Sequence, residues 1–307
     1  MNKALDWLHI SNSRKEVILR ITKFCNQKCL FCFTEIDNKT QVSFDLLKKE
    51  IDKIILDNKW SNLNFVITGW EPTLHKELLD IINYIFIKWY DITLQSNWVN
   101  FSDKLIKELK KYSSKLSFFI SFHSHLPKIY DFITDTNSQF DLAVFWIKKL
   151  LNNFDNITIN IVFNKSNQWN IKWYFYFIWN HFYSINKNLR INFSVMSNVY
   201  KYKYIDKLLI KYTDLVNEIN NSRKIIEYYN INIWSDFWWP CDLPFCIGEK
   251  LFYYKESDYS LRLESDRYID RKKIDTCNIC KYKNNCSWIL KLYLAKYWEG
   301  EFKWLIK

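Results

Sequence analysis

Glycine is scarce in this chain, whose 307 residues include 3 glycines and 15 tryptophans. Average glycine usage is about 7%, so the two counts together approach the number of glycines expected at this length. Some tryptophans stand where a turn or a helix end ordinarily uses glycine: Trp89 before a strand, Trp98 after Ser96-Asn97, and Trp238-Trp239 before Pro240. We hypothesise that many of these tryptophans are glycines in the living protein, encoded by UGA codons that its cells read as glycine. A genuinely tryptophan-rich protein is the alternative.

Long apolar runs are also missing from the sequence. No segment approaches the ~18 apolar residues that span a bilayer, and residues 1–9 lack the apolar stretch of a secretory signal. These absences predict a cytosolic, cytoplasmic protein without a membrane segment. The hydrophobic content of 49% argues against disorder, and the length allows one large domain or a core domain with a smaller one.

The net charge of +11 would suit an anionic partner such as RNA, a nucleotide or an acidic peptide. However, the lysines are spread over many separate segments. Solvated helix faces therefore explain the charge more simply than a nucleic-acid site does.

The eight cysteines fall into two clusters, one near each end of the chain. The clusters consist of Cys25, Cys29 and Cys32, and of Cys241, Cys246, Cys277, Cys280 and Cys286. A cytosolic chain keeps its thiols reduced and available as metal ligands. The spacing therefore predicts two metal sites and not a disulfide framework.

The first cluster has the spacing C-x3-C-x2-C and follows a predicted buried strand, Val17 to Ile21. Three thiolates from one loop can hold three irons of a [4Fe–4S] cluster, which leaves the fourth iron for a small molecule. A zinc site is the alternative, but zinc needs a fourth nitrogen or sulfur ligand nearby. The next residues, Phe33, Thr34 and Glu35, offer only an oxygen.

With Phe31 directly before its last cysteine, this loop resembles the cluster-binding loop of the radical S-adenosylmethionine (SAM) enzymes. A second segment, Thr68-Gly69-Trp70-Glu71-Pro72, is similar to the Gly-Gly-Glu-Pro segment that meets the SAM amino group in that family. The resemblance covers roughly residues 15–200. It departs from the family at Trp70, where the family has glycine and where an indole would crowd the SAM site.

The resemblance implies roles for individual residues. Cys25, Cys29 and Cys32 would ligate the cluster that cleaves SAM, and Phe31 would pack against the cluster and the adenine. Gly69, Trp70, Glu71 and Pro72 would form the SAM-binding turn, with Glu71 accepting a hydrogen bond from the SAM ammonium directly or through the turn. Polar residues at later strand ends would approach the ribose and the methionine carboxylate, with ordinary loop or structural roles as the alternative. They are Ser96, Asn97, Ser121, His123 and Asn164.

The second cysteine cluster, Cys277-x2-Cys280-x5-Cys286, resembles the SPASM/twitch extensions that follow many radical SAM barrels. The next cysteine of that motif is absent, since position 290 is leucine. The resemblance therefore implies one auxiliary [4Fe–4S] cluster, held by these three cysteines and by either Cys241 or Cys246. A structural zinc site that uses four of the five is the alternative.

Strands and helices are predicted to alternate, which is typical of parallel βαβ units. The expected strands are 16–22, 63–68, 91–95, 115–122, 157–163 and 189–195, and the expected helices are 43–55, 75–88, 103–112, 140–152, 170–182 and 202–229. Six such units predict an α/β fold, a partial (β/α)6 TIM-type barrel over residues 16–225, with its site at the C-terminal strand ends. Residues 1–15 would be a lead-in with an edge element. Residues 226–307 would form a small, irregular cysteine-rich module with a hairpin at 251–254 and 260–263.

By resemblance, the cluster reduces bound SAM to a 5′-deoxyadenosyl radical, which removes a hydrogen atom from the substrate. Barrels with such a tail often act on peptides or proteins, so a peptide or protein maturase is the first expectation. The implied electron donor is a flavodoxin or ferredoxin. A small-molecule or tRNA-modifying radical SAM enzyme is the second expectation. The third is a non-catalytic iron–sulfur or zinc protein.

Overall fold

The computed structural model describes most of the chain. The described residues are 8–11, 15–32, 40–58, 62–99, 101–196, 204–233, 243–248, 251, 271–281, 283, 286 and 288–302.

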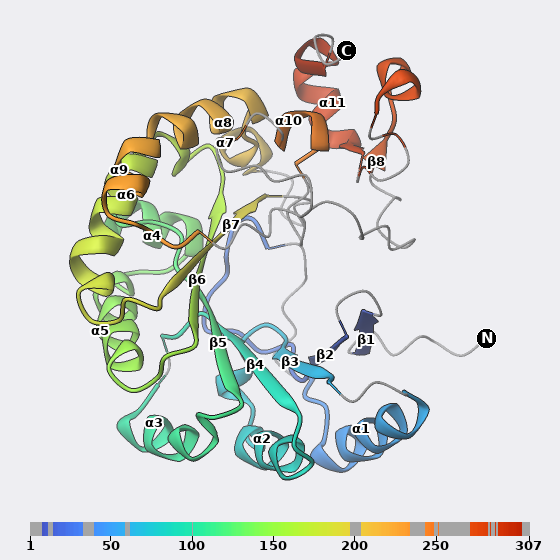
Figure 1. Cartoon of the computed structure of the whole chain (residues 1–307), viewed down its shortest axis with the longest axis vertical. Helices are drawn as coiled ribbons and strands as arrows, with labels where there is room; N and C mark the ends of the chain where they lie inside the picture. Colours follow the sequence, from blue (N-terminus) through green and yellow to red (C-terminus); the bar gives the residue numbers. More distant parts are fainter. Residues whose placement is uncertain are drawn as a thin grey trace.

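One seven-stranded sheet forms the centre of the molecule (Figure 1). Its strands are β1 (Leu8–Ser11), β2 (Glu16–Arg20), β3 (Asn64–Thr68), β4 (Asp91–Ser96), β5 (Leu116–Ser121), β6 (Ile157–Phe163) and β7 (Arg190–Val195). They lie in sequence order, and β1 pairs with β2 antiparallel while β2 to β7 are all parallel. The predicted partial barrel of six parallel strands and the edge element before it are thereby confirmed.

Helices connect the strands and lie around the outside of the sheet (Figure 1). The barrel helices are α1 (Phe44–Asp57), η1 (Pro72–Leu74), α2 (Leu78–Ile87), α3 (Asp103–Leu109), η2 (Lys110–Tyr112), α4 (Pro127–Thr134), α5 (Phe140–Leu151), η3 (Gln168–Asn170), α6 (Ile171–Ile178) and the π-helical turn η4 (Trp179–Tyr183). The sequence analysis missed α4.

The single helix predicted over 202–229 is wrong. The described part of that segment forms three helices, α7 (Ile205–Leu208), α8 (Tyr212–Asn221) and α9 (Arg223–Tyr228). Between α7 and α8 the consecutive residues Leu209 and Ile210 are both fully buried, as is Leu208. One face of a continuous surface helix cannot bury three consecutive side chains, so the chain turns there to bury them all.

The two faces of the sheet differ in polarity. The face toward the helices is apolar, and it carries for example Leu19, Ile67, Leu94 and Ile159, all fully buried. The opposite face carries polar side chains on every strand from β2 to β7. These are Glu16, Arg20, Asn64, Thr68, Asp91, Thr93, Gln95, Ser117, Ser121, Thr158, Asn160, Arg190, Asn192 and Ser194.

Polar groups on this second face bond to one another across the strands. Thr68 Oγ1 donates to Gln95 Oε1 at 2.8 Å, and Asn160 Oδ1 accepts from Asn192 Nδ2 at 2.8 Å and from Ser194 Oγ at 2.7 Å. A closed TIM barrel fills this space with branched apolar side chains. In this protein the same face instead carries hydrogen bonds between polar side chains of neighbouring strands.

The C-terminal segment packs against the barrel at α8 (Figure 1). Its described elements are α10 (Phe245–Gly248), β8 (Arg271–Lys272), η8 (Asp275–Ile279), β9 (Ile289–Leu290), α11 (Lys291–Tyr297) and η9 (Gly300–Phe302). Tyr293 of α11 stacks on Tyr212 with ring centroids 3.8 Å apart. Glu301 accepts hydrogen bonds from Thr213.

Two expectations about this segment are not tested. The predicted hairpin at 251–254 and 260–263 lies outside the described residues except for Leu251. The boundary at residues 225/226 falls inside α9, and Ile233 beyond it still bridges to Ile191 of β7. None of the described helices combines the length and apolar composition needed to cross a bilayer.

We predict that Tyr293→Phe lowers the free energy of unfolding by about 1–3 kcal/mol, as measured by chemical denaturation. The Tyr293 hydroxyl accepts the Tyr212 N–H at 3.0 Å in a buried site, so its removal leaves that amide unsatisfied. Tyr228, 81% exposed, supplies the control, because Tyr228→Phe removes a hydroxyl that water solvates. Equal losses in both variants would contradict this account of the docking.

Candidate functional site

The loops after β2 and β3 lie against each other at the C-terminal edge of the sheet. Backbone bonds run from the Trp70 N–H to the Thr22 carbonyl at 3.1 Å and from the Glu71 N–H to the Phe24 carbonyl at 2.8 Å. Between them Gly69 adopts φ +131°, and a Cβ on it would lie 2.5 Å from the Thr22 oxygen. Only glycine fits this crossing of two backbones.

Glu71 joins the turn after β3 to the end of β4. Its Oε1 accepts from the Thr73 N–H at 3.0 Å, from Thr73 Oγ1 at 2.6 Å and from Ser96 Oγ at 2.8 Å. Its Oε2 accepts the Asn97 N–H at 2.7 Å. Burial raises the pKa of the Glu71 carboxyl, and these four hydrogen bonds oppose the rise because they stabilise the charged form.

Asn97 extends this network to the cysteine loop. Its Nδ2 donates to Asn26 Oδ1 at 2.6 Å and approaches Cys25 Sγ at 3.8 Å. Cys25 Sγ also accepts the Gln27 N–H at 3.4 Å and lies 3.7 Å from the Trp70 carbonyl oxygen. Burial raises the pKa of the Cys25 thiol to about 12. The ends of β2, β3 and β4 therefore share one hydrogen-bond network around this thiol.

The helix α4 supports the other side of the cysteine loop. The N–H groups of Lys28 and Leu30 donate to the carbonyls of Thr134 and Ile133, at 3.0 and 2.8 Å. The sequence analysis missed this helix. Its signals were Pro127, which suits the first helical position, and the apolar residues three and six positions later, which are buried.

Gln27, which the sequence pattern did not single out, lies inside the cysteine loop and is 2% exposed. Its Nε2 donates to Tyr130 Oη and to Gln139 Oε1, both at 3.2 Å, and its Oε1 lies 3.7 Å from Cys29 Sγ. One buried amide thus joins the loop to α4 and to the start of α5.

Phe31 and His123, both predicted site residues, are in contact in the structure. Their rings meet edge to face with centroids 4.8 Å apart. His123 Nδ1 accepts the Val162 N–H at 3.1 Å, and burial lowers the pKa of His123 to about 3. A neutral imidazole used in this way supports the structural alternative for His123.

The remaining strand-end residues differ in what they can offer. Asn164 is fully buried, and its amide bonds to Val162 O and Ser166 N of its own loop, which supports the loop alternative. Ser121 is half-buried at the end of β5. Pro72 begins η1 directly after Glu71 and is buried.

The three cysteines of the loop form no disulfide and are of intermediate exposure. Cys32 is near enough to Cys25 for its charge to raise the pKa of that thiol. Among the described residues, no three histidine, cysteine or acidic side chains gather closely enough to hold one metal ion. A zinc ion draws its sulfurs to about 2.3 Å from one centre, whereas each cysteine of a cluster binds a different iron. Three thiols from one loop, each able to bind a different iron, are a donor set that fits a cluster.

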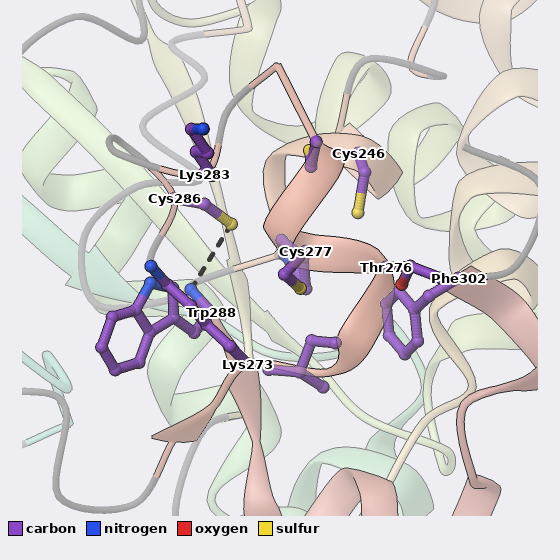
Figure 2. Close-up of a pocket in the computed structure, with 11 residues that line it drawn as sticks. Cys246, Lys273, Thr276, Cys277, Lys283, Cys286, Trp288 and Phe302 are labelled. Carbon is purple, nitrogen blue, oxygen red and sulfur yellow. Dashed lines mark hydrogen bonds between the residues drawn. The ribbon is translucent and has the colours of Figure 1, made fainter. Parts of the chain in front are cut away.

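A pocket in the C-terminal segment is lined by four of the remaining cysteines (Figure 2). They are Cys246 of α10, Cys277 and Cys280 at η8, and Cys286. None of the four forms a disulfide, and Lys273 and Lys283 line the same pocket. The Trp288 N–H donates to Cys286 Sγ at 3.4 Å, as the dashed line in Figure 2 shows.

This pocket bears on the choice between the two upstream cysteines. The structure brings Cys246 to the other three, while Cys241 lies outside the described residues. A set of four thiols beside two ammonium groups fits an anionic cluster with four protein ligands.

Parts of this chain are similar in sequence to known proteins. A family model described as the radical SAM superfamily matches residues 19–169. An S-adenosylmethionine-dependent nucleotide dehydratase of Selenomonas ruminantium is 29% identical over 82 residues, 27% of this chain and 29% of that protein. The antilisterial bacteriocin subtilosin biosynthesis protein AlbA of Bacillus subtilis is 26% identical over 153 residues, 49% of this chain and 34% of that protein.

Solved structures share the fold at low identity. SuiB of Streptococcus suis has a TM-score of 0.60 at 18% identity, covering 80% of this chain and 55% of that one. The anSMEcpe enzyme with bound AdoMet has a TM-score of 0.53 at 16% identity, covering 70% and 59%. The chain spans about a third of the length of the curated relatives it matches and about half that of these structures. Residues 19–169, the part of the chain that matches the radical SAM superfamily model, contain the cysteine loop, the turn after β3 and the ends of β4 to β6.

Proposed function

We propose that this chain is a radical SAM enzyme that removes a hydrogen atom from a peptide or protein substrate. The observation that carries the proposal is the network at the C-terminal edge of the sheet, where Glu71 and Asn97 hold the three-cysteine loop against the turn at Gly69. By the barrel rule, catalysis takes place at this edge.

Each part of the edge has a task in this proposal. Cys25, Cys29 and Cys32 would hold a [4Fe–4S] cluster, which together with SAM supplies the 5′-deoxyadenosyl radical. Gly69 lets the two backbones cross with no Cβ between them. Glu71 acts through the turn, because protein groups already occupy both of its oxygens. The Phe31–His123 pair supplies an apolar wall that helps to exclude water.

In the tail, Cys246, Cys277, Cys280 and Cys286 would hold one auxiliary [4Fe–4S] cluster. The ammonium groups of Lys273 and Lys283 would partly balance its negative charge. Structural zinc remains the alternative occupant. A flavodoxin or ferredoxin would supply the electron that SAM cleavage requires.

The polar face of the sheet supports a peptide substrate. A peptide presents N–H and C=O groups, and the hydroxyls of Thr68 and Thr93 and the amide of Gln95, all half-buried on this face, are donors and acceptors suited to them. Solved relatives of the same fold include SuiB bound to the precursor peptide SuiA and anSMEcpe bound to a peptide.

A small-molecule substrate is the second candidate. It is favoured by the 29% identity to a nucleotide dehydratase and the 27% identity to a probable GTP 3′,8-cyclase of Thermococcus kodakarensis. A gene for a short precursor peptide beside this one would favour the first candidate, and deuterium transfer from a labelled nucleotide into deoxyadenosine would favour the second.

The decisive experiment is anaerobic reconstitution of the chain and of its Trp70→Gly variant, followed by an iron count and an assay for 5′-deoxyadenosine after reduction. We expect about eight irons per chain and deoxyadenosine formation. About four irons with one zinc would give the tail a structural role. A cluster without deoxyadenosine in either protein would overturn the proposed activity.

Single cysteine variants should separate the two sites. Cys29→Ala is predicted to abolish deoxyadenosine formation while the tail retains its metal. Cys280→Ala is predicted to remove about half of the iron while the SAM-bound form of the first cluster keeps its electron paramagnetic resonance signal. If both variants lose all of their iron, the chain does not have two independent sites.

Gly69→Ala is predicted to weaken SAM binding at least tenfold and to destabilise the fold by about 1–3 kcal/mol, measured by calorimetric titration and denaturation. The reason is the Cβ, which would lie 2.5 Å from a backbone oxygen at a φ that L-residues rarely adopt. Gly300→Ala is the matched control, since a Cβ there meets no atom within 4 Å. Equal behaviour of the two variants would show that the crossing at Gly69 is not constrained.

A further inference from the structure

Tryptophan occupies backbone conformations that favour glycine. Among the described residues eight non-glycine residues have positive φ, and four of them are tryptophans. These are Trp89 (+66°), Trp98 (+59°), Trp288 (+62°) and Trp298 (+59°). Positive φ is uncommon outside glycine, asparagine and aspartate, and in a bulky residue it is an outlier. Four such outliers of one residue type require a common cause.

The two exposed members gain little from their side chains. Trp89 follows the last residues of α2, its N–H donates to the Phe86 carbonyl at 2.9 Å, and its side chain is 78% exposed. This is the left-handed position that glycine usually occupies after a helix. Trp298 follows α11 with φ +59° and ψ −170°, a region essentially restricted to glycine, and is 77% exposed. Neither indole buries enough surface to offset the backbone strain.

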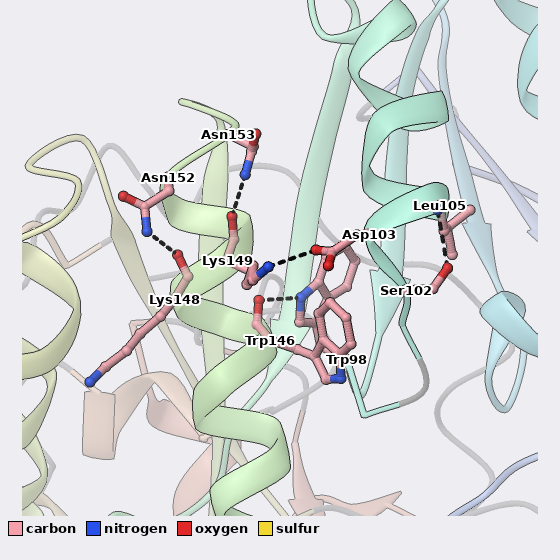
Figure 3. Close-up of polar contacts among 9 residues, drawn as sticks. All are labelled: Trp98, Ser102, Asp103, Leu105, Trp146, Lys148, Lys149, Asn152 and Asn153. Atoms are coloured by element: carbon pink, nitrogen blue, oxygen red, sulfur yellow. Dashed lines mark hydrogen bonds and ion pairs between the residues drawn. The ribbon is translucent and has the colours of Figure 1, made fainter.

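The buried member is crowded. Trp98 is fully buried, and its ring centroid lies 3.3 Å from that of Phe101, whereas aromatic pairs usually lie ~4.5–7 Å apart. Figure 3 shows its Nε1 reaching the Trp146 carbonyl of α5, at 2.9 Å. The turn itself needs only the backbone of residue 98, whose N–H donates to Ser96 Oγ at 2.9 Å.

A fifth tryptophan lies in the candidate site. The backbone of Trp70 makes the contacts to Thr22 and Cys25 described above, but its indole Nε1 is buried and has no hydrogen-bond partner in the described structure. An unsatisfied buried N–H is destabilising. The hydrogen bonds that residue 70 makes in this turn are therefore those of its backbone.

We infer that the chain made in its own cells carries glycine at positions 70, 89, 98, 288 and 298. The common cause is a UGA codon that those cells read as glycine. At four positions glycine removes the strain of positive φ, and at position 70 it removes a buried indole whose N–H has no partner among the described residues.

Tandem mass spectrometry of peptides from the protein isolated from its own cells tests the residue identity directly. We expect glycine at positions 70, 89, 98, 288 and 298 and UGA in the gene. Tryptophan in these peptides, or UGG codons, would overturn the inference. Neither readout depends on SAM, so glycine without deoxyadenosine formation would contradict the proposed function alone. Tryptophan with deoxyadenosine formation would contradict this inference alone.

Substitutions in the recombinant chain test the backbone argument. Glycine and alanine both remove the indole, so their difference reports on the backbone. At positions 89 and 298 the glycine variant should have a folding equilibrium constant about tenfold higher than the alanine variant. Trp173, 56% exposed inside α6, is the control, where the glycine variant should be about fivefold lower. If the same variant, glycine or alanine, is the more stable one at all three positions, the inference is overturned.

Discussion

The hydrogen bonds of the Glu71 carboxyl group are the interaction on which the candidate site depends. This group is fully buried, and it accepts hydrogen bonds from both its own turn and the end of β4. The residue that it fixes there, Asn97, in turn contacts the cysteine loop after β2. Because each group is held by the next, the position of Cys25 relative to Gly69 is determined by one buried carboxyl group with four donors. Such a network has little freedom to adjust if one member is lost.

The two faces of the sheet make different kinds of contact. The helix-facing side chains of β2 to β7 are mostly apolar and hold the sheet against its helices, while the opposite face combines polar side chains with apolar ones such as Ile18, Val66 and Phe119. Asn160, Asn192 and Ser194 are buried, and they bond to one another across β6 and β7. These bonds satisfy polar groups inside the barrel and help to fix the two strands. The tail, docked through Tyr293 on α8, adds a second cysteine site beside the same barrel.

Much of this architecture could be predicted from the sequence because it depends on local patterns. The apolar runs Val17 to Ile21 and Ile157 to Phe163 are strands, and the cysteine loop follows the first of them as expected. The bonds of Glu71 to Ser96 and Asn97 could not be predicted, because they join residues 25 and 26 positions apart. The role of Gln27 was hidden for the same reason, since its partners Tyr130 and Gln139 are more than 100 positions away.

The errors and the anomalies of the sequence have different physical origins. The prediction of one helix over 202–229 was wrong because the same apolar residues are compatible with one long helix or with several short ones. Only packing against the barrel decides between the two. Trp89 and Trp298 are a different case. There the backbone conformation, set by the ends of α2 and α11, conflicts with the residue at the position. In natural proteins the local preferences of each residue match the backbone conformation that the fold requires. Glycine, whose side chain is a hydrogen atom, would restore this match at both positions. The fold is therefore evidence about the residue as much as the residue is evidence about the fold.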